Sequence, residues 1–191
     1  VLKNNKGSED NRVRKLDYSI QLSKLFYERF INDEEISLFS PHEVPELYEA
    51  WGTPEFDELY ERTERKTSVK KTKVKAQDLI FDILKERAET GRIYIMNIDH
   101  CNTHSSFKDR VYMSNLCQEI TLPTDPIQHI DQEGEIALCI LSAINVGLIN
   151  KRDELEPLCD LAVRALDEII DHQKYPINAA EISTKARRSL G

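Results

Sequence analysis

Residues 76–96, AQDLIFDILKERAETGRIYIM, decide the fold class of this chain. Their first part carries apolar residues at helical spacing, which predicts an amphipathic helix over about residues 72–88. Gly91 stands where a helix commonly ends in the left-handed conformation. The apolar run from Ile93 to Met96 follows at once and is typical of a buried strand. Because helices that alternate with buried strands characterise α/β proteins, we expect that class here.

Outward from this stretch, helical and extended segments alternate along the chain. Further helices are predicted over residues 12–30, 41–51, 53–60 and 153–172, and a strand over residues 36–39. Ser40-Pro41 is expected to open the second of these helices, and the apolar run 136–146 fits a strand and a helix equally well. We expect irregular structure over residues 97–113 and a loop over 123–134. The alternation predicts an α/β fold with largely parallel strands.

The composition is that of an acidic chain whose length fits one domain. It has 191 residues, of which 40% are hydrophobic and 31% charged, and its net charge is -8. We expect a cytoplasmic protein, because no apolar run approaches the roughly 20 residues that span a bilayer and no secretory signal is present. The negative charge argues against general nucleic-acid binding. A basic cluster over residues 62–75 could bind phosphate, but we expect the solvated start of a helix there.

The cysteine pattern argues against a zinc ribbon. There is no Cys-x-x-Cys pair among the four cysteines, which are Cys101, Cys117, Cys139 and Cys159. Without a secretion signal, reduced thiols are the default expectation. Cys159 lies between Leu158 and Leu161 on the apolar face of the last predicted helix, so we expect it to be a small buried hydrophobic residue.

A metal site is one alternative for the polar stretch near residue 100. His100, Cys101 and His104, together with Cys117, are residue types that bind zinc. However, residues 100 and 101 are adjacent and their side chains face differently, whereas a tetrahedral site needs ligands that converge. We favour a structural interpretation, in which Asn102 and His104 tie down a polar loop.

Asn115, Cys117 and Glu119 form the most suggestive chemical group in the chain. In an extended backbone their side chains would project from one face, because successive side chains alternate. A thiol can give up a hydrogen atom, a carboxylate can move a proton, and an amide can orient a polar substrate. An ordinary half-buried strand with one free cysteine also fits residues 115–119.

Several blocks of the sequence, in order, resemble one enzyme family. They are NNKGSEDNRVRKLDY, LFSPHEVPELYEA, TGRIYIMNIDHCNTHSSF, SNLCQEITLPT and GEIALCILSAINVG. These blocks resemble the large, catalytic subunit of class I ribonucleotide reductase, most of all its bacterial and bacteriophage form. The resemblance covers essentially the whole chain. It implies part of a ten-stranded α/β barrel made of two half-barrels, in which a finger loop carries a cysteine into the centre.

The resemblance also implies roles for four side chains. Cys117 would become a transient thiyl radical that abstracts the 3′ hydrogen of a ribonucleoside diphosphate. Glu119 would take the proton of the 3′-hydroxyl as general base, and Asn115 would hydrogen-bond the substrate. Cys139 matches one member of the redox pair that delivers two electrons. No cofactor is expected in this chain, and the radical cofactor, di-metal or tyrosyl, would belong to a partner small subunit.

The same resemblance implies that residues 1–191 are an incomplete segment of the catalytic barrel domain. The second redox cysteine and the loop for the specificity effector would lie upstream, and the substrate-phosphate contacts and radical-relay tyrosines downstream. Expected partners are the small subunit, the rest of the large subunit, and thioredoxin or glutaredoxin. We expect this chain to be inactive by itself. A non-catalytic assembly or regulatory module derived from that subunit is the main alternative. A Cys/His metal-binding protein is the less favoured alternative.

Overall fold

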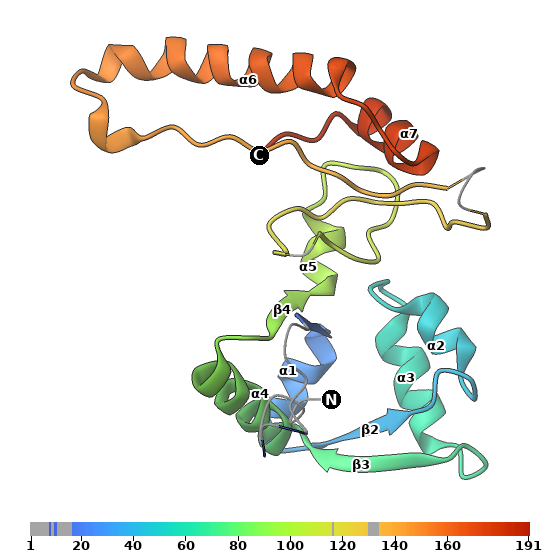
Figure 1. The fold of residues 1–191 in the computed structure, drawn as a ribbon. Coiled ribbons are helices and arrows are strands. Elements are labelled where there is room, and N and C mark those ends of the chain that lie inside the picture. The colour runs from blue at the N-terminus through green and yellow to red at the C-terminus, as the bar shows by residue number, and fades with distance from the viewer. Residues whose placement is uncertain (1–7, 9, 11–16, 116, 130–133) are drawn as a thin grey trace. The chain divides into compact units, whose positions relative to one another are not determined.

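The computed structural model describes residues 8, 10, 17–115, 117–129 and 134–191. These residues fall into two compact units, the first comprising residues 1–112 and 116–118 and the second 113–115 and 119–191. Helices and strands are mixed, as an α/β class requires (Figure 1). Over the described residues the named strands form two separate two-stranded sheets, which do not close into a barrel.

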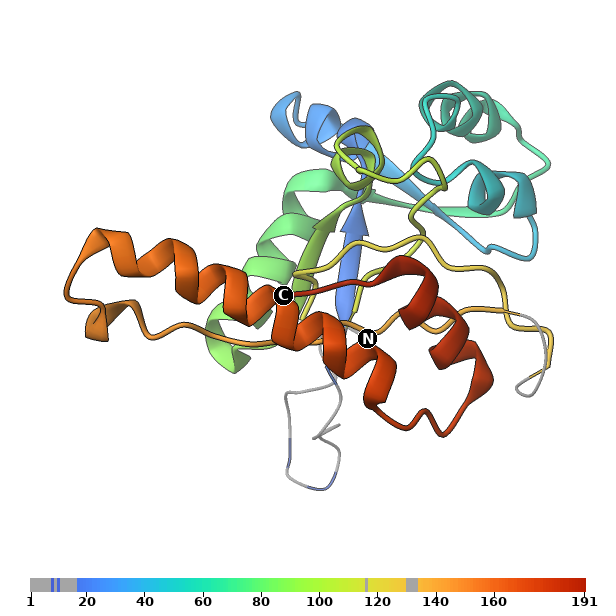
Figure 2. The ribbon, with the colours of Figure 1, turned by 90° about the horizontal axis from the view of Figure 1, so that it is seen from above.

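The first sheet joins two segments that are far apart in the sequence. Strand β1, Ser19–Leu22, pairs in parallel with β4, Tyr94–Asn97. The two strands lie side by side in Figure 2 as the blue arrow and its green neighbour. Strand β4 confirms the strand expected after Gly91. The parallel pair agrees with the expected strand direction.

The prediction of one long helix over residues 12–30 is confirmed for residues 24–30, which lie in α1, and is wrong for residues 17–23. After β1, the hydroxyl of Ser23 accepts a hydrogen bond from the backbone N–H of Phe26 at 3.3 Å and so caps helix α1, Lys24–Ile31. Residues 12–16 of the predicted helix lie outside the described residues. The apolar spacing suited a helix, but pairing with β4 makes residues 19–22 a strand.

The second sheet is antiparallel, which differs from the expected parallel arrangement. Strand β2, Glu35–Phe39, confirms the predicted strand and pairs with β3, Lys71–Lys75. The basic cluster is therefore not the start of a helix: it comprises the end of one helix, a turn and β3. In β3 the lysines alternate with Thr72 and Val74, and Val74 packs against the core while the lysines face outward.

Three further helices complete the first unit's main body. Helices α2, Pro45–Ala50, and α3, Phe56–Arg65, confirm the two short predicted helices in kind. The N-cap of α2 is Val44 and its first helical residue is Pro45, so Ser40-Pro41 does not cap it. Helix α4, Ala76–Thr90, begins a few residues later than expected and ends at Gly91, whose φ is 67°. The predicted left-handed glycine cap is confirmed.

One core cluster holds these elements together. It draws apolar side chains from β1, α1, β2, α2, α3 and α4, and its fully or nearly buried members include Leu22, Phe26, Val44, Leu47, Phe56, Tyr60, Ala76 and Ile83. Burial of such side chains contributes roughly 1.5–3 kcal/mol for each large one. The cluster packs α1 against α4.

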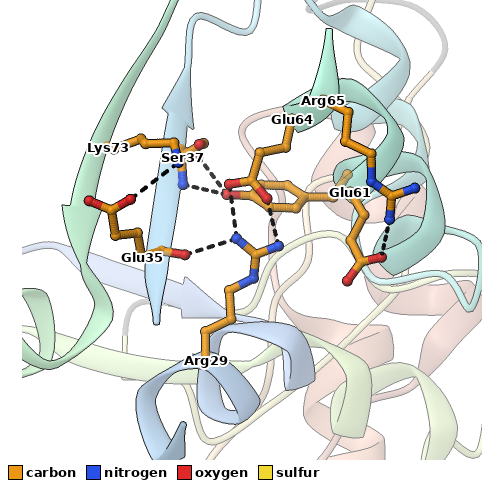
Figure 3. Close-up of polar contacts among 8 residues, drawn as sticks. Arg29, Glu35, Ser37, Glu61, Glu64, Arg65 and Lys73 are labelled. Atoms are coloured by element: carbon orange, nitrogen blue, oxygen red, sulfur yellow. Dashed lines mark hydrogen bonds and ion pairs between the residues drawn. The ribbon is translucent and has the colours of Figure 1, made fainter. Parts of the chain in front are cut away.

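A polar network crosses from this core to the strand β2 (Figure 3). The guanidinium of Arg29 in α1 makes two hydrogen bonds, at 2.9 and 2.7 Å, to the carboxylate of Glu64 in α3, and a third to the carbonyl of Glu35. The hydroxyl of Tyr60 accepts from the backbone N–H of Ser37 and donates to its carbonyl, both at 2.7 Å. Burial raises the pKa of Tyr60 to about 12, so the tyrosine stays a donor at any physiological pH.

The second unit contains two helices and an extended segment. Helix α6, Leu155–His172, confirms the last predicted helix, and α7, Asn178–Arg187, was not predicted. Two 3-10 turns, Val146–Leu148 and Arg152–Glu154, precede α6. The ambiguous run 136–146 is extended over most of its length, and its Ile140 forms a parallel bridge with Leu190.

Cys159 is exposed, which corrects its expected burial. The apolar face of α6 is covered only near its C-terminal end, where Leu166 and Ile170 are buried and α7 packs beside the helix. Leu158 and Leu161, the neighbours of Cys159, are exposed as well. Helical spacing therefore predicted the apolar face correctly but not how much of it is covered. None of the described helices combines the length and apolar character that a membrane crossing requires.

Removing the carboxylate of Glu64 should destabilise the first unit. Glu64→Ala leaves the Arg29 guanidinium, which is 10% exposed, without its ion-pair partner, and breaking such a pair costs about 3 kcal/mol. The matched control is Glu61→Ala on the same helix. Glu61 forms an ion pair with Arg65, whose side chain is 77% exposed, so this substitution should cost less than about 1 kcal/mol. Urea unfolding followed by the fluorescence of Trp51, the one tryptophan, measures both. Equal losses in the two variants would contradict this account.

The same pair should make stability depend on pH. Burial acts to raise the pKa of Glu64, but the hydrogen bond and charge of Arg29 outweigh it, so the pKa lies below its ordinary value. The stabilisation is therefore present above about pH 4.3, the ordinary pKa of glutamate, and is lost as the pH falls through the lower folded value. Urea unfolding at a series of pH values should show this loss in the wild type and a smaller one in Glu64→Ala.

Candidate active site

The chain leaves β4 through a short helix that was not predicted. Residues 97–113 were expected to be irregular, but Ile98–Thr103 form helix α5, and the chain beyond it has no regular structure up to Met113. A small core cluster of Met96, Ile98 and Val111, with Trp51 and Cys101 against it, packs α5 onto the preceding strand. Burial raises the pKa of Cys101, which favours the protonated form of this thiol.

Asn102 ties down the segment that follows α5, as predicted. Its side-chain oxygen accepts from the backbone N–H of Val111 at 2.8 Å, and its amide nitrogen donates to the carbonyls of Val111 and Ile98 at 3.0 and 3.1 Å. His104 contacts its own helix instead, with Nδ1 3.0 Å from the hydroxyl of Thr103. The structural interpretation of this stretch is thus confirmed for Asn102.

The geometry of the polar stretch does not assemble a metal site among the residues that the structure describes. The rings of His100 and His104 meet edge to face with centroids 5.5 Å apart. No group of three or more His, Cys, Asp or Glu side chains in the described ranges is arranged to hold a metal ion. Cys101, the candidate ligand between the two histidines in the sequence, packs in the core cluster instead.

Asn115 and Ile120 are bonded to each other, and residues 117–119 between them do not form the extended strand on which the row of side chains was based. The backbone N–H of Asn115 donates to the carbonyl of Ile120 at 3.3 Å, and the side-chain Oδ1 of Asn115 accepts from the N–H of Ile120 at 3.1 Å. Gln118 has a φ of 60°, in the left-handed region, so the alternation of faces expected for a strand fails here. Cys117 is exposed near the middle of the loop.

Asn115 therefore has a structural role, closing the loop, that the sequence did not reveal. Because a backbone N–H can only donate, the atom that faces Ile120 must be the amide oxygen of Asn115. The loop is closed by one main-chain and one side-chain hydrogen bond across its two ends. No pattern in the sequence points to Ile120 as the partner of Asn115.

Cys139 lies outside this loop but is linked to it electrostatically. Its half-buried thiol lies next to Ile140, whose backbone N–H donates to the carbonyl of Ser189 at 3.1 Å and whose carbonyl accepts from Gly191 at 2.9 Å. Burial raises the pKa of Cys139, and the negative charge of the exposed Glu119 raises it further. The thiol of Cys139 is therefore held in its protonated form more firmly than a free cysteine.

Neutralising Glu119 should lower the pKa of Cys139. In Glu119→Gln the repulsion between carboxylate and thiolate is gone, so at pH 8 more of Cys139 is thiolate and alkylation by iodoacetamide is faster. We expect an increase of less than about tenfold, which corresponds to one pKa unit. Mass spectrometry of the peptide that contains Cys139 measures the rate. Glu181→Gln on α7 removes a carboxylate that pairs with Lys185 at the surface and should leave the rate unchanged; an unchanged rate in Glu119→Gln would contradict the link.

Comparisons with known proteins agree on one family. The sequence family described as "Ribonucleotide reductase, barrel domain" matches residues 1–191. The chain is 57% identical to the ribonucleoside-diphosphate reductase subunit alpha of Haemophilus influenzae and 42% identical to that of Enterobacteria phage T4. It is 54% identical to the ribonucleoside-diphosphate reductase 1 subunit alpha of Escherichia coli.

Each of these matches covers 100% of this chain and 26% of the relative. The chain thus spans about a quarter of the length of the curated relatives. The predicted resemblance to the bacterial and bacteriophage large subunit is confirmed. A family match along the full length, together with relatives at this level of identity, shows that the chain belongs to the barrel-domain family of the ribonucleotide reductase large subunit.

Proposed function

We propose that residues 1–191 are a segment of the catalytic barrel domain of a ribonucleoside-diphosphate reductase large subunit, and that Cys117 is its radical site. The observation that carries the proposal is the loop 115–120, in which the ends are fastened to each other and the thiol of Cys117 is exposed. A radical thiol must reach its substrate directly. An exposed thiol in a loop with fixed ends meets that need better than one inside a strand.

The residues of the loop supply the first chemical steps. The Cys117 thiyl radical takes the 3′ hydrogen atom from a ribonucleoside diphosphate, which forms an S–H bond and leaves the unpaired electron on C3′. The carboxylate of Glu119 takes the proton of the 3′-hydroxyl, and proton transfer of this kind is typically worth about 10²–10⁴-fold in rate. Asn115 uses its oxygen to close the loop, so its N–H₂ group is the part that would donate to the substrate.

The overall reduction needs two electrons and two protons. Two thiols supply both when they form a disulfide, and the 2′-hydroxyl leaves as water, so one ribonucleotide and two thiols give one deoxyribonucleotide, one disulfide and one water. Cys139 is proposed as one of these thiols. Its raised pKa suits a group that must carry a proton as well as an electron into the reaction.

The remaining parts of the reaction belong to partners. A small subunit would hold the radical cofactor, which supplies the oxidising equivalent that converts Cys117 to its radical. Thioredoxin or glutaredoxin would reduce the disulfide after turnover, and nucleotide effectors would act on the complete assembly. We place this activity in the cytoplasm. The chain described here would be inactive unless it is joined by the rest of the large subunit.

Activity should depend on Cys117 and on the complete assembly. In a complete large subunit with its small subunit, reductant and a ribonucleoside diphosphate, Cys117→Ser should abolish deoxyribonucleotide formation, because a hydroxyl cannot form the radical reversibly. Cys159→Ser is the matched control, since this thiol is exposed on α6, and it should retain turnover. Residues 1–191 with the small subunit alone should form no product. Unchanged turnover in Cys117→Ser would favour the non-catalytic assembly module instead.

A further inference from the structure

Three consecutive residues shortly before the Cys117 loop are fixed by hydrogen bonds in which a side chain takes part. They are Arg110, Val111 and Tyr112, and each of them takes part in at least one hydrogen bond to a distant segment. This stretch has no helix or strand of its own. Its position is therefore set by side chains, and the sequence gives no local pattern that would predict it.

The middle residue of the stretch is held most completely. Val111 is fully buried, and both of its backbone groups are bonded to the side chain of Asn102 on α5. The amide oxygen of Asn102 accepts from the backbone N–H of Val111, and its amide nitrogen donates to the carbonyl of Val111. Substitution of Asn102 by an apolar residue would leave a buried backbone N–H and C=O unbonded, which costs more than the bonds themselves contribute.

The two flanking residues are held from β1 and from the end of α2. Gln21 on β1 donates from Nε2 to the carbonyl of Tyr112 at 2.8 Å and accepts from the indole N–H of Trp51 at 2.5 Å. The guanidinium of Arg110 donates to the carbonyls of Glu49 and Trp51. It also lies over the ring of Tyr112, 4.5 Å from the centroid. Trp51 is thus bonded on two sides, once through its side chain and once through its backbone.

We propose that Asn102 and Gln21 are positioning residues for Cys117, and that they act by fixing residues 110–112, which precede Cys117 in the chain. This inference rests on the proposed function, since it needs Cys117 to be the reacting group. Cys117 belongs to the same compact unit as Asn102, Gln21 and residues 110–112. A reacting atom that is displaced by about 1 Å can lose roughly 10²-fold in rate, so a chain that reaches Cys117 without regular structure needs a firm anchor.

The test compares variants of the complete large subunit, assayed with the small subunit, reductant and a ribonucleoside diphosphate. Asn102→Ala removes the pairing with Val111, and Gln21→Met removes the bonds to Tyr112 and Trp51 at nearly constant size. Thr103→Ala is the matched control, because the Thr103 hydroxyl bonds to local groups away from residues 110–112, namely the carbonyl of Asp99 at 2.9 Å and Nδ1 of the adjacent His104 at 3.0 Å. We expect kcat to fall by about 10²-fold in Asn102→Ala and by less in Gln21→Met, with KM nearly unchanged. Thr103→Ala should retain its kcat.

Hydrogen exchange separates positioning from a general loss of stability. In both test variants the amides of residues 111–120 should exchange faster, while those of α4 keep their wild-type rates. Faster exchange with an unchanged kcat would overturn the proposal, and so would an equal loss of kcat in Thr103→Ala. If Asn102→Ala does not fold, Gln21→Met decides by the same criteria. An active Asn102→Ala beside an inactive Cys117→Ser would overturn this inference alone, whereas an active Cys117→Ser would overturn the proposed function with it.

Discussion

The parallel pairing of β1 with β4 is the constraint on which the rest of the first unit depends. Its register sets Gln21 opposite Met96 and Leu22 opposite Asn97, so the end of β1 lies beside the start of α5. From there Gln21 reaches the segment before the Cys117 loop, and α5 presents Asn102 to the same segment. A shift of this register by one residue would turn Gln21 to the opposite face and detach it from Tyr112.

Local signals predicted the elements whose cause is local. Helix α4, its cap at Gly91 and strand β4 follow from apolar spacing, a glycine and a short apolar run, and all three are present. Strand β1 was mistaken for a helix because the partner that makes it a strand lies far away in the sequence. Ile93, a β-branched residue, takes a φ of 73° directly before β4, a conformation that no pattern of residue types would indicate.

The geometry around the proposed site residues could not be predicted from the sequence. Resemblance to the family pointed to Asn115, Cys117 and Glu119, whereas the alternation rule applied to them failed because the chain turns at Gln118. The link between Glu119 and Cys139 depends on their proximity in the fold and has no sequence signature. The contact of Asn102 with the backbone of the buried Val111 has no sequence signature either. Such contacts arise from tertiary packing, which residue spacing does not encode.

The central claim is that Cys117 starts the chemistry, separately from the thiols that provide electrons. A single-turnover reaction of the complete enzyme without external reductant tests it most directly, because regeneration of the dithiol then plays no part. The wild type should form deoxyribonucleoside diphosphate in an amount limited by its own thiols, and Cys117→Ser should form none. An equal amount of product from Cys117→Ser would contradict the claim.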